Sequence, residues 1–206
     1  YHDKRSDELV GASANSISSG NWTVPGTSDN WTDPYAKIGV ANNIIAKGAS
    51  APLADAVKNR WLAEAYFFRA YHYFDLVKKY GDVPLILKVF DTTNDPEIKK
   101  ARTPREEVIQ KCYSDLEFSR KWLPDINDLK DDTNWGRVSR SAALGLMVRI
   151  GLYEGTYSKY HNLGNDYKNH LKKSIDAAET LIKEGKHSLY PDFQALFTFA
   201  GEGRQN

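Results

Sequence analysis

A long apolar helix with a defined end, within residues 61–87, constrains the fold of this chain more than any other feature. One stripe of apolar side chains recurs there at the 3.6-residue period of an α-helix: Ala63, Phe67, Ala70, Phe74 and Val77. A second, largely apolar stripe lies beside it: Leu62, Tyr66, Arg69, Tyr73, Leu76 and Tyr80. Because two adjacent faces are apolar, this helix is expected to be wedged between neighbouring helices. Gly81 is typical of a helix C-cap, and Pro84 prevents the helix from resuming.

The other periodic segments also predict helices, so the expected fold class is all-α. Residues 1–32 are rich in Gly, Ser and Asn and predict an irregular loop. Pro34 is expected at the first position of a helix that begins at Asp33, and Thr103 to Glu106 reads as a capping box. Helices are expected near residues 34–47, 52–80, 104–123, 139–157 and 166–184. The expected buried residues are Ala63, Phe67, Ala70, Phe74, Leu116, Met147, Ile150, Ile175 and Ala178.

Antiparallel helices of this length, with alanines at their contact points, are typical of helical hairpin repeats. The strict 34-residue spacing of the tetratricopeptide repeat is absent from the chain. Degenerate repeats with long inserted loops therefore fit better than a regular array. A generic helix bundle remains the alternative on pattern alone.

Composition excludes several classes of function. The chain carries 28 Lys and Arg against 27 Asp and Glu, so no charge field of one sign exists to gather nucleic acid or an anionic membrane. It contains no apolar run of transmembrane length and no signal peptide. Because it begins with Tyr, we expect it to be an excised portion of a longer protein. The single cysteine, Cys112, excludes an internal disulfide and a cysteine-based metal cage, and its spacing predicts burial.

No pattern in the chain predicts catalysis, a metal site or a cofactor. No two of the five histidines are three or four residues apart, so none forms a zinc-binding pair. His72 is expected to be structural, and the other four are expected to be solvated: His2, His161, His170 and His187. No phosphate-binding glycine loop and no nucleophile elbow occurs. The paired carboxylates at 106–107 and 131–132 fall at a helix start and in a loop, where they complement the helix dipole or face water.

Three Asn-Trp dipeptides indicate binding: Asn21-Trp22, Asn30-Trp31 and Asn134-Trp135. Sugars present apolar C–H faces and hydroxyl rims, so a sugar site suits a flat aromatic ring with an amide or carboxylate nearby. Trp22 lies in a loop with no apolar partners and is the preferred candidate, whereas Trp31 is in register with a helix and is expected to pack in the core. Trp135 is intermediate, and Trp61 and Trp122 are expected to be packing residues. Alternatively, the three dipeptides occur by chance, or they are turn residues beside core tryptophans.

Five blocks of the sequence, in order, resemble the SusD/RagB family of outer-membrane nutrient-binding lipoproteins. One block is AEAYFFRAYHYFDLVKKYGDVPLIL, which is similar to the family's signature helix. The others are Trp31 with Tyr35, Ile38 and Asn43; Thr103–Val108 with Asp115-Leu116 and Leu123-Pro124; Gly136–Ala143 running into Arg149–Tyr153; and Asp192-Phe193 with Leu196-Phe197.

The resemblance implies a tetratricopeptide-like superhelix within a protein more than twice this long. Residues 1–206 would be one SusD-like helical domain fragment, with an N-terminal loop segment (1–32), tetratricopeptide-like helices (33–197) and a tail (198–206) leading to a C-terminal region outside this sequence. The full-length protein would sit on the outer face of the outer membrane, held by a lipid anchor that this sequence lacks. Without its C-terminal region, the chain is expected to expose apolar surface and to associate.

The resemblance also implies a function without catalysis: binding of a nutrient, expected to be an oligosaccharide, and its delivery to a SusC-like TonB-dependent transporter. Family members place part of the ligand site on the segment before the first helix. The candidate ligand residues are therefore Asp7, Glu8, Asn21, Trp22 and Trp135. Arg69 and Arg137 resemble scaffold arginines and are expected to tie helices together by ion pairs. Two alternatives remain, a scaffold for protein–protein interaction only and a peptide-binding member of the RagB type.

Overall fold

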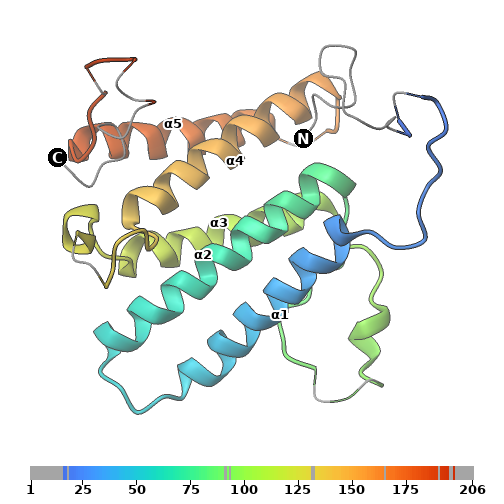
Figure 1. Cartoon of the computed structure of the whole chain (residues 1–206), viewed down its shortest axis with the longest axis horizontal. Coiled ribbons are helices and arrows are strands. Elements are labelled where there is room, and N and C mark those ends of the chain that lie inside the picture. The colour runs from blue at the N-terminus through green and yellow to red at the C-terminus, as the bar shows by residue number, and fades with distance from the viewer. Residues whose placement is uncertain are drawn as a thin grey trace. The chain divides into compact units, whose positions relative to one another are not determined.

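The computed structural model describes residues 16–17, 19–90, 92, 94–130, 133–164, 166–189, 191–194 and 197. The chain divides into two compact units, residues 1–33 and 34–206. Its elements are α1 (Asp29–Ala49), α2 (Asp55–Tyr80), the short 3₁₀ helix η2 (Pro96–Lys99), α3 (Arg105–Trp122), the short 3₁₀ helix η3 (Ile126–Leu129), α4 (Arg140–Tyr160) and α5 (Tyr167–Glu184) (Figure 1). In the described residues, β pairing is limited to an isolated antiparallel bridge between Val83 and Thr103. The predicted all-α class is confirmed.

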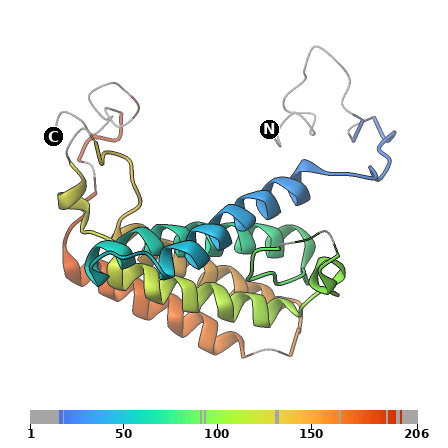
Figure 2. The ribbon, with the colours of Figure 1, turned by 90° about the horizontal axis from the view of Figure 1, so that it is seen from below.

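Successive helices of the second unit alternate in direction, and α2 to α5 pack in chain order (Figures 1 and 2). The most extensive contacts join α2 to α3 and α4 to α5, and α3 also packs on α4. Seven of the nine predicted core residues are buried at these seams: Ala63, Phe67, Ala70, Phe74, Leu116, Met147 and Ile150. The two apolar stripes of α2 are thus covered on both sides, as the sequence predicted. None of the helices in the described part is long and apolar enough to span a membrane.

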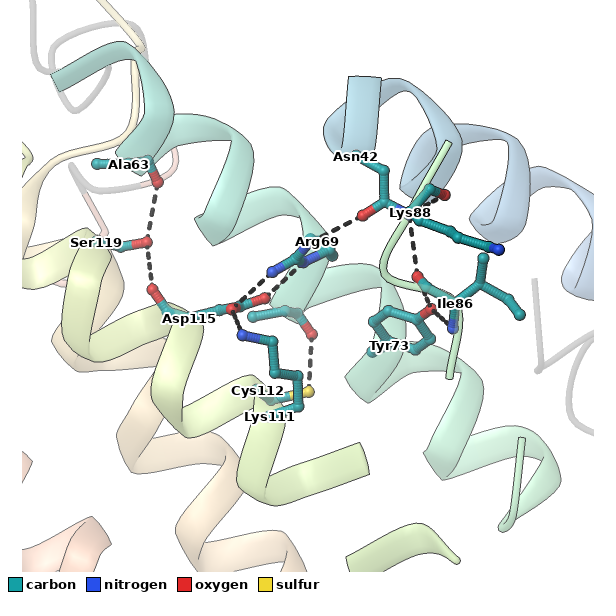
Figure 3. Close-up of polar contacts among 11 residues, drawn as sticks. Asn42, Ala63, Arg69, Tyr73, Ile86, Lys88, Lys111, Cys112, Asp115 and Ser119 are labelled. Atoms are coloured by element: carbon teal, nitrogen blue, oxygen red, sulfur yellow. Dashed lines mark hydrogen bonds and ion pairs between the residues drawn. The ribbon is translucent and has the colours of Figure 1, made fainter. Parts of the chain in front are cut away.

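Helix α1 is attached mainly through the irregular segment that follows α2. The Tyr35 hydroxyl donates to the carbonyl oxygen of Pro84 at 2.8 Å. The Asn42 side-chain amide donates to the carbonyl oxygens of Ile86 at 3.0 Å and Lys88 at 3.3 Å (Figure 3). These carbonyl groups belong to no regular ladder, so the side chains of α1 supply hydrogen-bond donors to them, and the carbonyl oxygen of Ile86 also accepts from the Tyr73 hydroxyl at 2.7 Å.

Two predicted helix ends are confirmed. Gly81 follows α2 with a φ of 70°, and its N–H donates to the carbonyl oxygen of Val77 at 2.9 Å. Gly185 follows α5 in the left-handed conformation with a φ of 62°. Glycine reaches positive φ without the steric cost that a Cβ would add, so both positions end their helices locally.

Two predicted helix starts are wrong. Helix α1 begins at Asp29, so Pro34 lies inside the helix. Thr103 forms no capping box, because its backbone pairs with Val83 and its hydroxyl accepts the backbone N–H of Leu85 at 3.2 Å. The start of α3 is satisfied instead by Asp82, whose carboxylate accepts the N–H of Arg105 at 2.8 Å.

The predicted packing face of α5 is also wrong. Ile175 is 55% exposed and Ala178 is only half-buried. The buried residues of α5 are His170, Ser174 and Ala177. Their position follows from a glycine of α4: a Cβ added to Gly151 would lie 2.6 Å from the carbonyl oxygen of His170 and 2.9 Å from the Cβ of Ser174. The two helices approach so closely that only small side chains fit their seam, which turns the isoleucine stripe outward.

His170, expected to be solvated, is instead 1% exposed. Its Nδ1 lies 3.0 Å from the hydroxyl of Tyr113, and its Nε2 lies 3.0 Å from a carboxylate oxygen of Glu106. Both partners belong to α3, so His170 joins the start of α5 to α3. Burial raises the pKa of Tyr113 well above its ordinary value, which keeps its phenol protonated.

Candidate functional site

The first candidate site is the loop around Trp22 in the first unit. A turn precedes it, in which Asn21 N–H donates to the carbonyl oxygen of Ser16 at 2.9 Å and Gly20 has a φ of 74°. The Trp22 side chain is 54% exposed, and Asn21 beside it is exposed. A half-exposed indole next to an amide suits the apolar face and hydroxyl rim of a sugar. Asp7 and Glu8, the other predicted residues of this loop, lie outside the described residues.

Trp31 stands in the first turn of α1, where its backbone N–H donates to the carbonyl oxygen of Ser28 at 2.9 Å. Its side chain is partly buried: it is less buried than a core residue and more buried than Trp22. Trp31 was expected to pack in the core from a position just before the helix; it lies instead within α1, which begins two residues earlier, and is not a core residue.

The second candidate site is the loop around Trp135 in the second unit. Residues on both sides of this tryptophan are anchored to the first turns of α2. On one side, the Arg60 guanidinium donates to the side-chain oxygen of Asn134 at 3.1 Å. On the other, Arg137 donates two hydrogen bonds to the carboxylate of Glu64, at 3.0 Å and 2.5 Å. Trp135 is 42% exposed between these anchors, so the loop is fixed on both sides of an indole that reaches solvent.

Trp61 was wrongly predicted to be only a packing residue. Its side chain is 44% exposed, and the guanidinium carbon of Arg137 lies 4.7 Å from the centre of its ring. The loop around Trp135 and the N-terminal part of α2 thus bring two tryptophans, an ion pair and an amide into one region. A signal for Trp61 existed in the sequence, because Trp61 and Phe68 are seven residues apart and belong to neither of the two buried stripes.

Arg69 was predicted to be structural, and its contacts agree with that. Its guanidinium donates to the two carboxylate oxygens of Asp115 at 2.7 Å and 2.9 Å, and to the side-chain oxygen of Asn42 at 2.9 Å (Figure 3). Lys111 adds a second cation 2.8 Å from Asp115. One arginine therefore joins α1, α2 and α3. Arg137, paired with Glu64, ties a loop to a helix in the same manner.

The chemistry available at both candidate sites is stacking and hydrogen bonding. Within the described part of the chain, no group of three or more His, Cys, Asp or Glu side chains is placed to hold a metal ion. Cys112 is buried, and burial raises the pKa of its thiol well above the ordinary value, so its reactive thiolate is disfavoured. The aromatic, amide and ion-paired groups fit the recognition of a neutral polar ligand.

Comparison with known proteins gives consistent matches. A family model described as starch-binding and associating with the outer membrane, SusD-like, matches residues 4–152. SusD-like protein P2 from Formosa agariphila is 30% identical over 173 residues, which cover 81% of this chain and 30% of that protein.

Comparison with solved structures gives matches to the same family. A SusD superfamily protein from Parabacteroides distasonis is 28% identical with a TM-score of 0.69, and the match covers 88% of this chain and 37% of that one. Surface glycan-binding protein A from Bacteroides fluxus is 26% identical with a TM-score of 0.67, covering 91% and 37%. The likeness confirms the tetratricopeptide-like helical fold, and the chain spans about a third of the length of these relatives. The chain belongs to the SusD-like family of starch-binding proteins associated with the outer membrane.

Proposed function

We propose that this chain is the helical part of a non-catalytic protein that binds oligosaccharides at the outer-membrane surface. The observation that carries the proposal is the half-exposed Trp22 beside Asn21, on an irregular loop of a SusD-like chain. The indole supplies a face for the C–H groups of a sugar ring, and the amide supplies a donor and an acceptor for its hydroxyls. Asp7 and Glu8 are proposed to add carboxylate acceptors from the same segment.

Trp135 is proposed as a further ligand contact. Its loop is anchored by Asn134 and Arg137 on either side, so presenting this indole to a ligand costs little ordering. Stacking and hydrogen bonding suffice for reversible capture, and neither requires a bond in the sugar to break.

The whole protein is proposed to be lipid-anchored on the extracellular face of the outer membrane and to deliver its ligand to a SusC-like TonB-dependent transporter. The family's association with the outer membrane supports this location. Two other functions remain outcomes of the test: a scaffold whose helices contact only the partner protein, and a peptide-binding protein of the RagB type.

The proposal is tested by titrating the full-length protein with starch, β-glucan and xyloglucan oligosaccharides and with short peptides. Trp22→Ala is expected to weaken oligosaccharide binding by roughly 1–3 kcal/mol, the scale for losing an aromatic contact at a binding site. The melting temperature should hardly change, because the loop contributes little to the core.

Trp31→Ala is the matched control, expected to lower the melting temperature and to affect the ligand only indirectly. If Trp22→Ala lowers the melting temperature as much as Trp31→Ala and leaves affinity intact, Trp22 is a packing residue and the site lies elsewhere. Binding of peptides without binding of any oligosaccharide would assign the peptide-binding alternative.

A further inference from the structure

We draw no further inference here: the strongest candidate, the apolar groove of about 420 Å³ that Val40 and Ile44 of α1 form with Trp61 and Phe68 of α2, is exposed in a chain that spans about a third of its relatives' length, and nothing in the structure shows what covers it.

Discussion

Arg69 of α2 and Asp115 of α3 form a buried ion pair with two hydrogen bonds, at 2.7 Å and 2.9 Å, and their side chains are 3% and 1% exposed. The same guanidinium reaches Asn42 of α1 at 2.9 Å. The remaining polar atoms of the pair are thereby hydrogen-bonded, which is the condition under which a buried pair is tolerated. The ion pair and the hydrogen bond to Asn42 together fix three helices of the second unit to one another.

Removing one member of this pair should destabilise the fold strongly. Arg69→Met is expected to cost roughly 3–5 kcal/mol of unfolding free energy, because it leaves the Asp115 carboxylate buried with only Lys111 as a cation. The double variant Arg69→Met/Asp115→Leu should recover a large part of that loss, since no fully buried charge is left unpaired and Lys111, whose side chain is 27% exposed, can turn to solvent. Urea denaturation measures both. A single variant that loses less than about 1 kcal/mol would show that the pair is dispensable.

Phe74 should contribute strongly to the free energy of unfolding through its packing in the core. Its ring is buried and meets Tyr153 of α4 edge to face, with ring centres 5.6 Å apart. Phe74→Ala is expected to cost roughly 3–5 kcal/mol, as large-to-small changes in cores do. Phe68→Ala on the exposed face of the same helix is the control and should cost about 1 kcal/mol or less. Equal losses in chemical denaturation would contradict the assignment of the two faces.

The close approach of α4 and α5 predicts opposite effects on stability for two glycine-to-alanine substitutions in α4. Gly151→Ala would place a Cβ 2.6 Å from the carbonyl oxygen of His170, so the helices must separate, at a cost of roughly 1–3 kcal/mol. Gly145→Ala, on the same helix with nothing within 4 Å of the new Cβ, should instead stabilise by roughly 0.5–1 kcal/mol. Melting curves of the two variants should therefore shift in opposite directions.

His72 should make stability depend on pH. Burial lowers the pKa of His72 below its ordinary value, the nearby Lys37 lowers it further, and Asp75 opposes both. The unfolded chain therefore binds the proton more readily, so the contribution of His72 is fully present above about pH 6.5 and is lost as pH falls toward the folded-state pKa.

His72→Gln should flatten this part of the pH dependence between about pH 7 and pH 5. His187→Gln, at an exposed position, is the control and should leave the profile unchanged. Denaturation at a series of pH values measures both. An unchanged slope in His72→Gln would show that this histidine does not titrate with folding.

What the sequence alone determined is local. The two stripes of α2 predicted its wedged position because a period of 3.6 residues places those side chains on fixed faces whatever their partners are. Gly81 and Gly185 predicted helix ends for an equally local reason, since glycine reaches a positive φ without steric cost. The exposure of Trp22 followed from the absence of any periodic partner around it.

What the tertiary structure decided depends on which residues meet across helices. Ile175 faces outward and His170 inward because Gly151 of another helix draws the backbone of α5 close, and no pattern within α5 records that approach. Thr103 forms no cap because Val83, twenty residues earlier, pairs with its backbone. Trp61 lines a groove because α1 is bonded to the segment after α2. Periodicity tells which side chains share a face, and only packing between distant segments decides which face is covered.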